Sequence, residues 1–179
     1  MDAGFMEILR KRRSIRRYRD RPVEAEKRDL LVEAALRSPS SRGINPWRFV
    51  FVEDRRTIAD MSRCKGHGSA FLEGAPLAVA VFAREEESDV WVEDCSIASI
   101  VLQLAAESLG LGSCWVQVRN RTREDGSSSS EYLRDLLGLP EGSAAESVIG
   151  IGYPAESLPP HPEASLERHK VHMGSWSGK

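Results

Sequence analysis

The chain has 179 residues, a mass of 19.9 kDa, 41% hydrophobic residues and 29% charged residues. This length fits one domain, or one domain plus an arm, and the composition excludes a disordered, collagen-like or disulfide-scaffold protein. The net charge is −2, but residues 10–21 contain eight Lys or Arg and one Asp, which gives +7 there and −9 elsewhere. The charge therefore indicates a local anion site and argues against a nucleic-acid-binding face.

The first quarter of the chain predicts two helices and a strand. Apolar residues among charges predict a short helix over residues 2–12, followed by the basic segment in a turn or extended form. An amphipathic helix is expected over 24–37, with one apolar stripe made of Leu30, Leu31, Ala34 and Ala35. A polar loop over 38–45 then leads into a buried strand, Trp47–Val52, and such a loop is a good position for ligand contacts.

The rest of the chain alternates helices and strands irregularly, so the predicted class is α+β. The longest helical pattern, 88–109, is apolar almost all round, which predicts a helix buried at the centre of the fold or between subunits. Shorter helices are expected over 57–62 and 130–137, with a turn at 127–130 and a basic loop at 63–69. Three further strands are expected over 75–83, 114–118 and 147–153.

The C-terminal residues predict an arm on a single domain. Four prolines fall within 154–162, so residues 154–179 are expected to extend from a domain that covers 1–153. Val171, Met173 and Trp176 near its end suggest that this arm wraps around a partner.

Cysteine usage and hydropathy predict the compartment. The cysteines at 64, 95 and 114 are odd in number and lack metal or redox spacing, so we expect no disulfide. No signal peptide or membrane span is predicted, and the expected location is the cytoplasm.

Three familiar motifs fail on inspection. A G-x-G-x-x-A pattern occupies 150–155, but Pro154 stands where a dinucleotide-binding turn would open a helix. Residues 66–70 lack the preceding strand and the final glycine of a nucleophile elbow. His169 and His172 lie in a non-helical segment with no third ligand nearby, so we expect surface histidines and no metal site.

Three other segments carry chemistry, although each also has an ordinary structural interpretation. Residues 12–16 combine guanidinium groups with a hydroxyl, which suits a phosphate, or else form a solvated charged run or a nucleic-acid arm. Residues 39–47 form a hydrogen-bonding loop that ends at a tryptophan, or a plain connection. Residues 110–117 follow the long helix. They form either a strand that lines a ligand, or a helix cap followed by an ordinary core strand.

In this order the segments resemble the nitroreductase family of flavoproteins. The family patterns R-x-S-x-R/K, P-S-x-x-N-x-Q-P-W, G-L-G-x-x-W and G-Y-P are matched by residues 12–16, 39–47, 110–115 and 152–154, across nearly the whole chain. The resemblance implies a central, mainly antiparallel sheet flanked by helices, with the C-terminal arm extending onto the partner subunit. It also implies an obligate homodimer with FMN in crevices at the subunit interface.

The resemblance further implies a role for particular residues, all of them in binding. The FMN phosphate, ribityl chain and pyrimidine edge would be held by Arg12, Arg13, Ser14 and Arg16. Contacts from the other subunit would come from Pro39, Ser40, Ser41 and Asn45. The isoalloxazine would be lined by Trp115, Val116, Gln117 and Val118, and Lys170 would be a second phosphate ligand. No catalytic residue and no metal are assigned.

The sequence departs from the family pattern in its loop. Gly43 stands where many members have Asn, and Asn45 where they have Gln, so one flavin-edge contact is lost or shortened, and Arg42 is a candidate to replace it. The chain is also short, which implies an open pocket with loose specificity.

The resemblance implies an oxidoreductase. It would transfer hydride from NAD(P)H to FMN and then to a small-molecule acceptor, a nitroaromatic, a quinone or another conjugated compound, by a ping-pong cycle. The alternatives are an FMN-binding carrier or sensor without NAD(P)H turnover, and a non-reductive reaction such as dehalogenation or flavin fragmentation.

Overall fold

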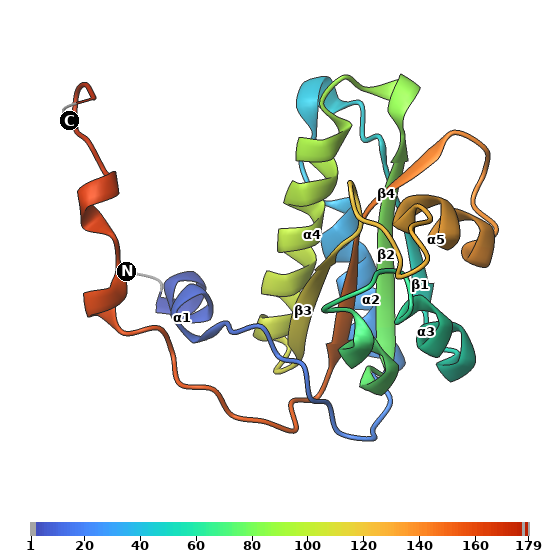
Figure 1. The fold of residues 1–179 in the computed structure, drawn as a ribbon. Helices are drawn as coiled ribbons and strands as arrows, with labels where there is room; N and C mark the ends of the chain where they lie inside the picture. The colour runs from blue at the N-terminus through green and yellow to red at the C-terminus, as the bar shows by residue number, and fades with distance from the viewer. Residues whose placement is uncertain (1–2, 177, 179) are drawn as a thin grey trace.

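The computed structural model describes residues 3–176 and 178, and its centre is one antiparallel sheet. Its four strands lie in the order β1-β2-β4-β3, with every neighbouring pair antiparallel (Figure 1). The strands are β1 (Trp47–Val52), β2 (Leu77–Arg84), β3 (Gly112–Gln117) and β4 (Ser143–Gly152). The predicted α+β class is confirmed, and β3 lies at one edge of the sheet.

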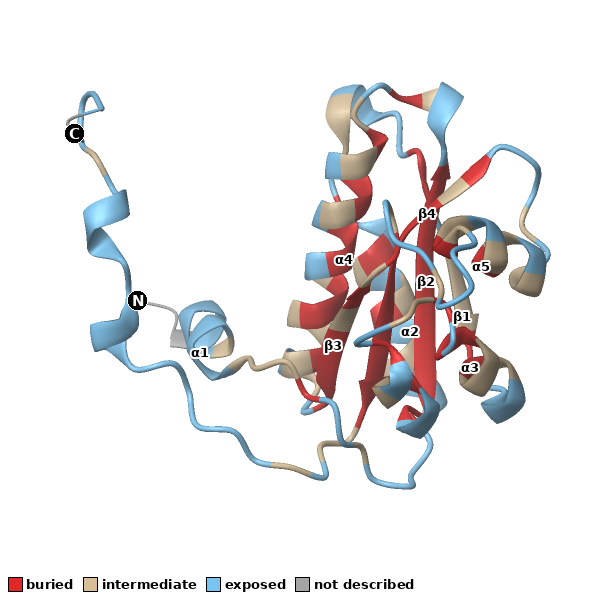
Figure 2. Cartoon of the chain, in the orientation of Figure 1, coloured by how far each residue is buried: buried red, intermediate tan, exposed pale blue. Residues whose placement is uncertain are grey.

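Helices cover both faces of this sheet. One core contains residues of α2 (Ala25–Leu36) and α4 (Trp91–Ser108), and the other contains residues of α3 (Arg55–Met61) and α5 (Ser129–Leu137). Successive residues of β2 alternate between the two cores, and all except Arg84 are buried (Figure 2). A strand covered on both faces reads as a continuous apolar run, which is why the sequence predicted it.

Two elements differ from expectation in detail. Strand β4 begins at Ser143, four residues before the predicted start, because residues 143–146 lack the β-branched residues by which strands are recognised. The apolar stripe of α2 is narrower than predicted. Leu31 and Ala35 are buried, whereas Leu30 is 49% exposed.

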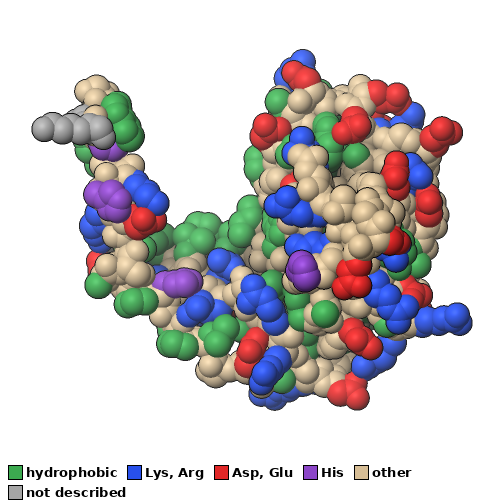
Figure 3. Space-filling model, in the orientation of Figure 1, with side chains coloured by type: hydrophobic (Ala, Val, Ile, Leu, Met, Phe, Trp, Pro, Cys, Tyr) green, Lys and Arg blue, Asp and Glu red, His purple; other side chains and the backbone are tan. Residues whose placement is uncertain are grey.

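The outer surface of α4 stays exposed in the single chain. Ile97 and Ile100 are 39% and 38% exposed, although the opposite side of the helix packs on the sheet. The neighbouring helix α1 (Ala3–Lys11) also exposes apolar side chains, Phe5, Met6 and Leu9. Figure 3 shows hydrophobic groups gathered in the hollow between the body and the C-terminal segment. The predicted burial of α4 on several sides is therefore not met within one chain.

The C-terminal segment leaves the body after β4. Its only regular turns in the described part are the short 3-10 helices η4 (Glu163–Ser165) and η5 (Arg168–Lys170). Val171, Met173 and Trp176 are exposed at 65%, 89% and 76%, so the part of the chain that is described provides no core for them. Their burial by a partner remains a prediction.

Cysteines and helix hydropathy add two observations. The three cysteines are buried free thiols, and burial raises the pKa of Cys64 to about 11 and of Cys95 to about 12. Among the described residues, no helix is long and apolar enough to cross a membrane, and no group of three or more His, Cys, Asp and Glu could hold a metal ion.

Candidate functional site

The basic segment lies along the outer edge of β3. Ser14 forms a parallel bridge with Ser113, and the Ile15 N–H donates to the Ser113 carbonyl at 3.0 Å. Gly112 makes this approach possible, because a Cβ there would lie 2.8 Å from the buried Ile15 side chain. Gly112, the first residue of β3, therefore provides room for the basic segment.

The opposite side of the segment is held by the start of the arm. The Arg19 N–H donates to the Tyr153 carbonyl at 2.8 Å, and the Ala155 N–H donates to the Arg17 carbonyl at 2.9 Å. The Glu156 carboxylate accepts the backbone N–H groups of Arg16 and Arg17 at 2.7 and 3.1 Å. These bonds lower the pKa of Glu156. The backbone of residues 14–19 is thus fixed between β3 and the arm, which leaves the side chains as the variable part.

The arginines of this segment keep donors available for a ligand. Arg13 donates to the Pro159 carbonyl, and Arg16 donates to the Ser14 carbonyl at 3.4 Å. Within the described chain, no carboxylate forms an ion pair with Arg12, Arg13 or Arg16. Of these three arginines, Arg13 lines a cavity of about 300 Å³, whose lining also includes Lys11, Glu107, Gly110, Leu111 and Glu156. Three guanidinium groups without a carboxylate partner in the described chain, in one short segment with the Ser14 hydroxyl, are a donor set that suits a phosphate.

The free edge of β3 continues this site. Hydrogen bonds of an antiparallel strand alternate in direction, and the Ser113 carbonyl points outward to Ile15. The N–H groups of Trp115 and Gln117 therefore point to the same free edge. Val116 and Val118 differ, because their side chains are buried in the core below α3 and α5, and the Val118 N–H donates inward to the Glu146 carbonyl at 3.0 Å. Of the four predicted flavin-lining residues, Trp115 and Gln117 thus provide the edge donors.

The side chains on this part of β3 form a connected network. The Trp115 indole N–H donates to Gln117 Oε1 at 3.0 Å, and Gln117 Nε2 donates to the Arg119 carbonyl and to Glu146 Oε1, both at 3.3 Å. Sequence reasoning missed Glu146, which is 3% exposed. The signal available in the sequence was an acidic residue directly beside the apolar run predicted as a strand over 147–153.

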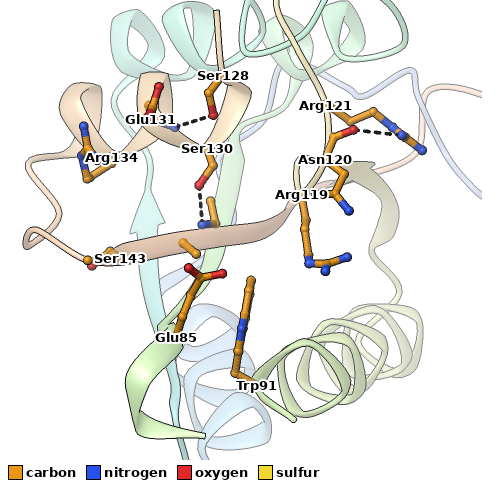
Figure 4. A pocket seen from close by; sticks show the side chains of 13 residues that line it. Glu85, Trp91, Arg119, Asn120, Arg121, Ser128, Ser130, Glu131, Arg134 and Ser143 are labelled. Carbon is orange, nitrogen blue, oxygen red and sulfur yellow. Dashed lines mark hydrogen bonds between the residues drawn. The ribbon is translucent and has the colours of Figure 1, made fainter. Parts of the chain in front are cut away.

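A second cavity, of about 390 Å³, lies just beyond the end of β3. Trp91 forms part of its floor, with the Arg119 guanidinium 5.9 Å from the centre of the indole ring. Figure 4 shows Glu85 on the side of this space opposite Arg119, and Ser130 above it. The sequence did not indicate this cavity, because its lining comes from five separated segments of the chain.

The predicted loop is a structured turn anchored to the start of α4. The Ser40 hydroxyl donates to Asn45 Oδ1 and accepts the Asn45 backbone N–H, both at 2.8 Å, and the Ser41 N–H donates to buried Asp94 at 2.8 Å. Arg42 and Asn45 have φ values of 55° and 53°, the left-handed region that non-glycine residues seldom adopt. Arg42 pairs with Asp89 at 2.5 Å. Its guanidinium is therefore engaged on the surface rather than at the loop centre.

The structure does not bring all predicted site residues together in one chain. The loop is anchored at Asp94, whereas the cavity of the basic segment includes Glu107, thirteen residues further along α4. That separation is about 20 Å along a helix. Lys170 lies on η5, pairs with Glu167 at 2.6 Å, and within the described chain makes no hydrogen bond to residues 12–16. The predicted site residues therefore fall into separate groups within the single chain.

The fold is an α+β sandwich with a basic segment at the edge of its sheet, and comparison with known proteins gives the family. The family model described as "Nitroreductase family" matches residues 9–69 and 62–153. The chain belongs to the nitroreductase family, which confirms the resemblance drawn from the four motifs.

Solved and curated relatives agree with this assignment. An FMN-dependent nitroreductase from Clostridium difficile is 43% identical, with a TM-score of 0.93 over 97% of this chain and 99% of that chain. A protein of Methanothermobacter thermautotrophicus named "Putative NADH dehydrogenase/NAD(P)H nitroreductase" is 37% identical over 96% of this chain and 87% of its own length. An FMN reductase (NAD(P)H) of Bacillus subtilis is 30% identical over 87% of this chain and 68% of its own. These names fit the expected class of enzyme, an FMN-dependent NAD(P)H oxidoreductase.

Proposed function

We propose that this protein is an FMN-dependent oxidoreductase that takes hydride from NAD(P)H and passes it to a nitroaromatic, a quinone or a similar conjugated acceptor. The observation that carries the proposal is the basic segment along β3, where Arg12, Arg13 and Arg16 form no ion pair within the described chain and Arg13 lines a cavity at the edge of the sheet. The names of the relatives point to the same cofactor and donor. Bound FMN supplies the redox chemistry, and it leaves no acid or base step for the protein to perform.

The residues of the chain then have binding and orienting roles. Arg12, Arg13 and Arg16 hold the phosphate by charge-assisted hydrogen bonds, and Ser14 adds a hydroxyl. The edge N–H groups of Trp115 and Gln117 are the main-chain donors for the polar rim of the ring. Positive charge from Arg13 favours the reduced cofactor, because negative charge develops on the flavin when it is reduced.

We further propose that the working unit is a homodimer with two shared sites. The loop with Ser40, Ser41 and Asn45 lies at one end of α4 and the basic segment at the other, so a second copy running in the opposite direction would supply the missing half. The exposed apolar groups on α1, α4 and the arm are the surface that such a copy would cover (Figure 3). Lys170 would reach a phosphate only through this partner.

The cavity of about 390 Å³ at the end of β3 is a candidate place for part of the nicotinamide donor or the acceptor. It begins two residues beyond Gln117 and combines the indole of Trp91 with the cation of Arg119. An indole face and a guanidinium suit an aromatic or anionic group. This open arrangement agrees with loose specificity for the acceptor.

Anaerobic reduction tests this function. Purified protein loaded with FMN should bleach on addition of NADH or NADPH and regain its colour with a quinone or a nitroaromatic compound. Each half-reaction should proceed alone, as a ping-pong cycle requires. If FMN binds but neither nicotinamide reduces it, the protein is a flavin carrier or sensor. If FMN does not bind at micromolar concentration, the proposal is wrong.

A further inference from the structure

Strand β4 contains a bulge beside the proposed flavin edge. On β2, Val81 pairs with Ser147 and Phe82 pairs with Ala145, so Glu146 has no partner in that register. Ala145 and Val148 belong to the same core, although their odd spacing would place them on opposite faces of a regular strand. The extra residue reverses the alternation. Bulges are frequent next to active sites, where they re-aim a side chain.

The bulge directs two successive polar side chains to the α4 face. The Ser147 hydroxyl bonds to the Ser99 hydroxyl of α4 at 2.8 Å, and Glu146 Oε1 accepts from Ser96 at 3.4 Å and from Gln117 at 3.3 Å. The carbonyl of Glu146 also accepts the N–H groups of Val118 and Arg119, at 3.0 and 3.1 Å. One residue therefore holds the end of β3 by both its main chain and its side chain.

The Glu146 carboxyl is costly to place here. The residue is 3% exposed, and its second oxygen, Oε2, is buried without a hydrogen-bond partner. Burial raises the pKa of this carboxyl, with Arg119 acting against that rise and Glu93 of α4 adding to it. Its charge also helps to raise the pKa of the neighbouring Cys95. A buried carboxyl with one oxygen that lacks a hydrogen-bond partner is unfavourable, so packing alone does not explain its presence here.

Its contact with Gln117 supplies that reason. Trp115 fixes Gln117 Oε1 and Glu146 fixes Gln117 Nε2, so both ends of the amide are held inside the protein. The Gln117 amide is therefore held away from the free edge of β3, and the backbone N–H is the donor that Gln117 presents there. We propose that Glu146 is a positioning residue that fixes the Gln117 amide and thereby the edge of β3 against which the flavin ring lies. This inference rests on the proposed function, since it concerns the same site.

Two variants of the full-length protein test the proposal, with a matched control. Glu146→Gln keeps the size of the side chain and removes the carboxyl, whereas Glu146→Ala removes the contact. Ser147→Ala is the control, because it alters the neighbouring bulge residue and its bond to α4 without touching Gln117.

The first measurement does not need flavin. The side-chain amide signals of Gln117 in a ¹⁵N spectrum, assigned by their loss in Gln117→Met, should move in both Glu146 variants and stay in place in Ser147→Ala. Unchanged signals in both Glu146 variants would overturn the proposal even if the protein is a flavoenzyme.

The second measurement uses FMN. Glu146→Ala should weaken FMN binding by about fivefold or more, as expected for lost hydrogen bonds of modest strength, while Ser147→Ala stays near wild type. The absorption band of bound flavin should also shift in Glu146→Ala, which a general loss of stability would not cause. Equal FMN affinity in Glu146→Ala and Ser147→Ala would refute the positioning role. If no variant and no wild type binds FMN, the proposed function fails, and the amide spectrum still decides whether Glu146 fixes Gln117.

Discussion

The two ends of α4 carry different halves of the proposed site, and they are built in different ways. At the C-terminal end, the basic segment is held by main-chain bonds on both sides, to Ser113 on β3 and to the start of the arm. At the N-terminal end, the loop depends on side chains, because Ser40 bonds to Asn45 and Asp94 holds the Ser41 N–H. The backbone conformation of the first half is therefore set by main-chain bonds, whereas that of the second half depends on side chains.

The basic segment and the loop should therefore contribute to FMN binding in different ways. Guanidinium groups on a fixed backbone supply charge and affinity, and a side-chain-stabilised turn supplies shape. Since the halves lie about 20 Å apart along one helix, they would meet between two chains of the proposed homodimer. Substitutions at the two ends should therefore have distinguishable effects on flavin affinity and on assembly.

Removal of the arm should have the largest effect. Deleting residues 155–179 removes Glu156, which accepts two N–H groups of the basic segment, together with Lys170 and the exposed apolar groups of the arm. Both flavin retention and dimer stability should fall, and sedimentation with flavin absorbance as the signal measures both. An intact holoprotein that sediments as a monomer at low micromolar concentration, with flavin bound, would refute the shared site and make residues 39–45 a structural loop.

Replacing Gly112 with Val should have the next largest effect. Its side chain would collide with Ile15 and push the basic segment off β3. Overpacking of about 1–3 kcal/mol predicts a loss of FMN affinity of about 5- to 150-fold. Gly4→Ala in α1 is the control, because nothing lies within 4 Å of a Cβ there. FMN titration followed by flavin fluorescence gives the result, and wild-type affinity in Gly112→Val would show that the segment does not hold the cofactor.

Replacing Arg16 with Ala should remove one charge-assisted phosphate contact. Such a contact contributes roughly 1.5–3 kcal/mol, so the affinity for FMN should fall by about tenfold or more. Arg17→Ala is the matched control, since Arg17 contributes main-chain groups to this region and its exposed side chain has no hydrogen bond in the described structure. Equal dissociation constants for the two variants would remove Arg16 from the site.

Replacing Asp94 with Ala tests the other half and should have a smaller effect. The Ser41 N–H loses its acceptor, so the loop loosens while the basic segment is unchanged. One hydrogen bond of ordinary strength predicts a loss of FMN affinity of about three- to fivefold. Asp89→Ala removes only the exposed pair with Arg42 and serves as the control. A loss as large as that of Arg16→Ala would contradict the division between the two halves.

The pH dependence of stability should change slightly in Glu146→Gln. Because burial raises the pKa of Glu146 above 4.5, its stability contribution is present at low pH and is lost as pH rises through the folded-state pKa. In acid the variant should melt at the same temperature as wild type. At neutral pH it should melt at a higher temperature, by about 2–4 °C for each kcal/mol that the variant gains in free energy of unfolding. Thermal melts across this range measure the difference. A constant difference at all pH values would show that Glu146 does not titrate in the native protein.

The sequence by itself predicted much of the fold because its strands are local apolar runs. Trp47–Val52 was recognised with correct bounds, and β2 and α4 within three residues at each end, since both are long and apolar. The family followed from four short motifs in register, and these are local in sequence too. The start of β4 was missed, because residues 143–146 lack the β-branched residues by which a strand is recognised.

Only the tertiary structure decided which groups of each motif face the site. The sequence motif alone does not distinguish the four residues at 115–118. In the structure, β3 is an edge strand and the Ile15 N–H bonds to its Ser113 carbonyl. The N–H groups of Trp115 and Gln117 therefore point outward, and those of the two valines point inward. The contact between Gln117 and Glu146 joins residues 29 positions apart. The distance between the loop and the basic segment likewise depends on the length of α4, which both of them contact at opposite ends. Pairing across a sheet and anchoring along a helix are non-local, so no sequence window contains them.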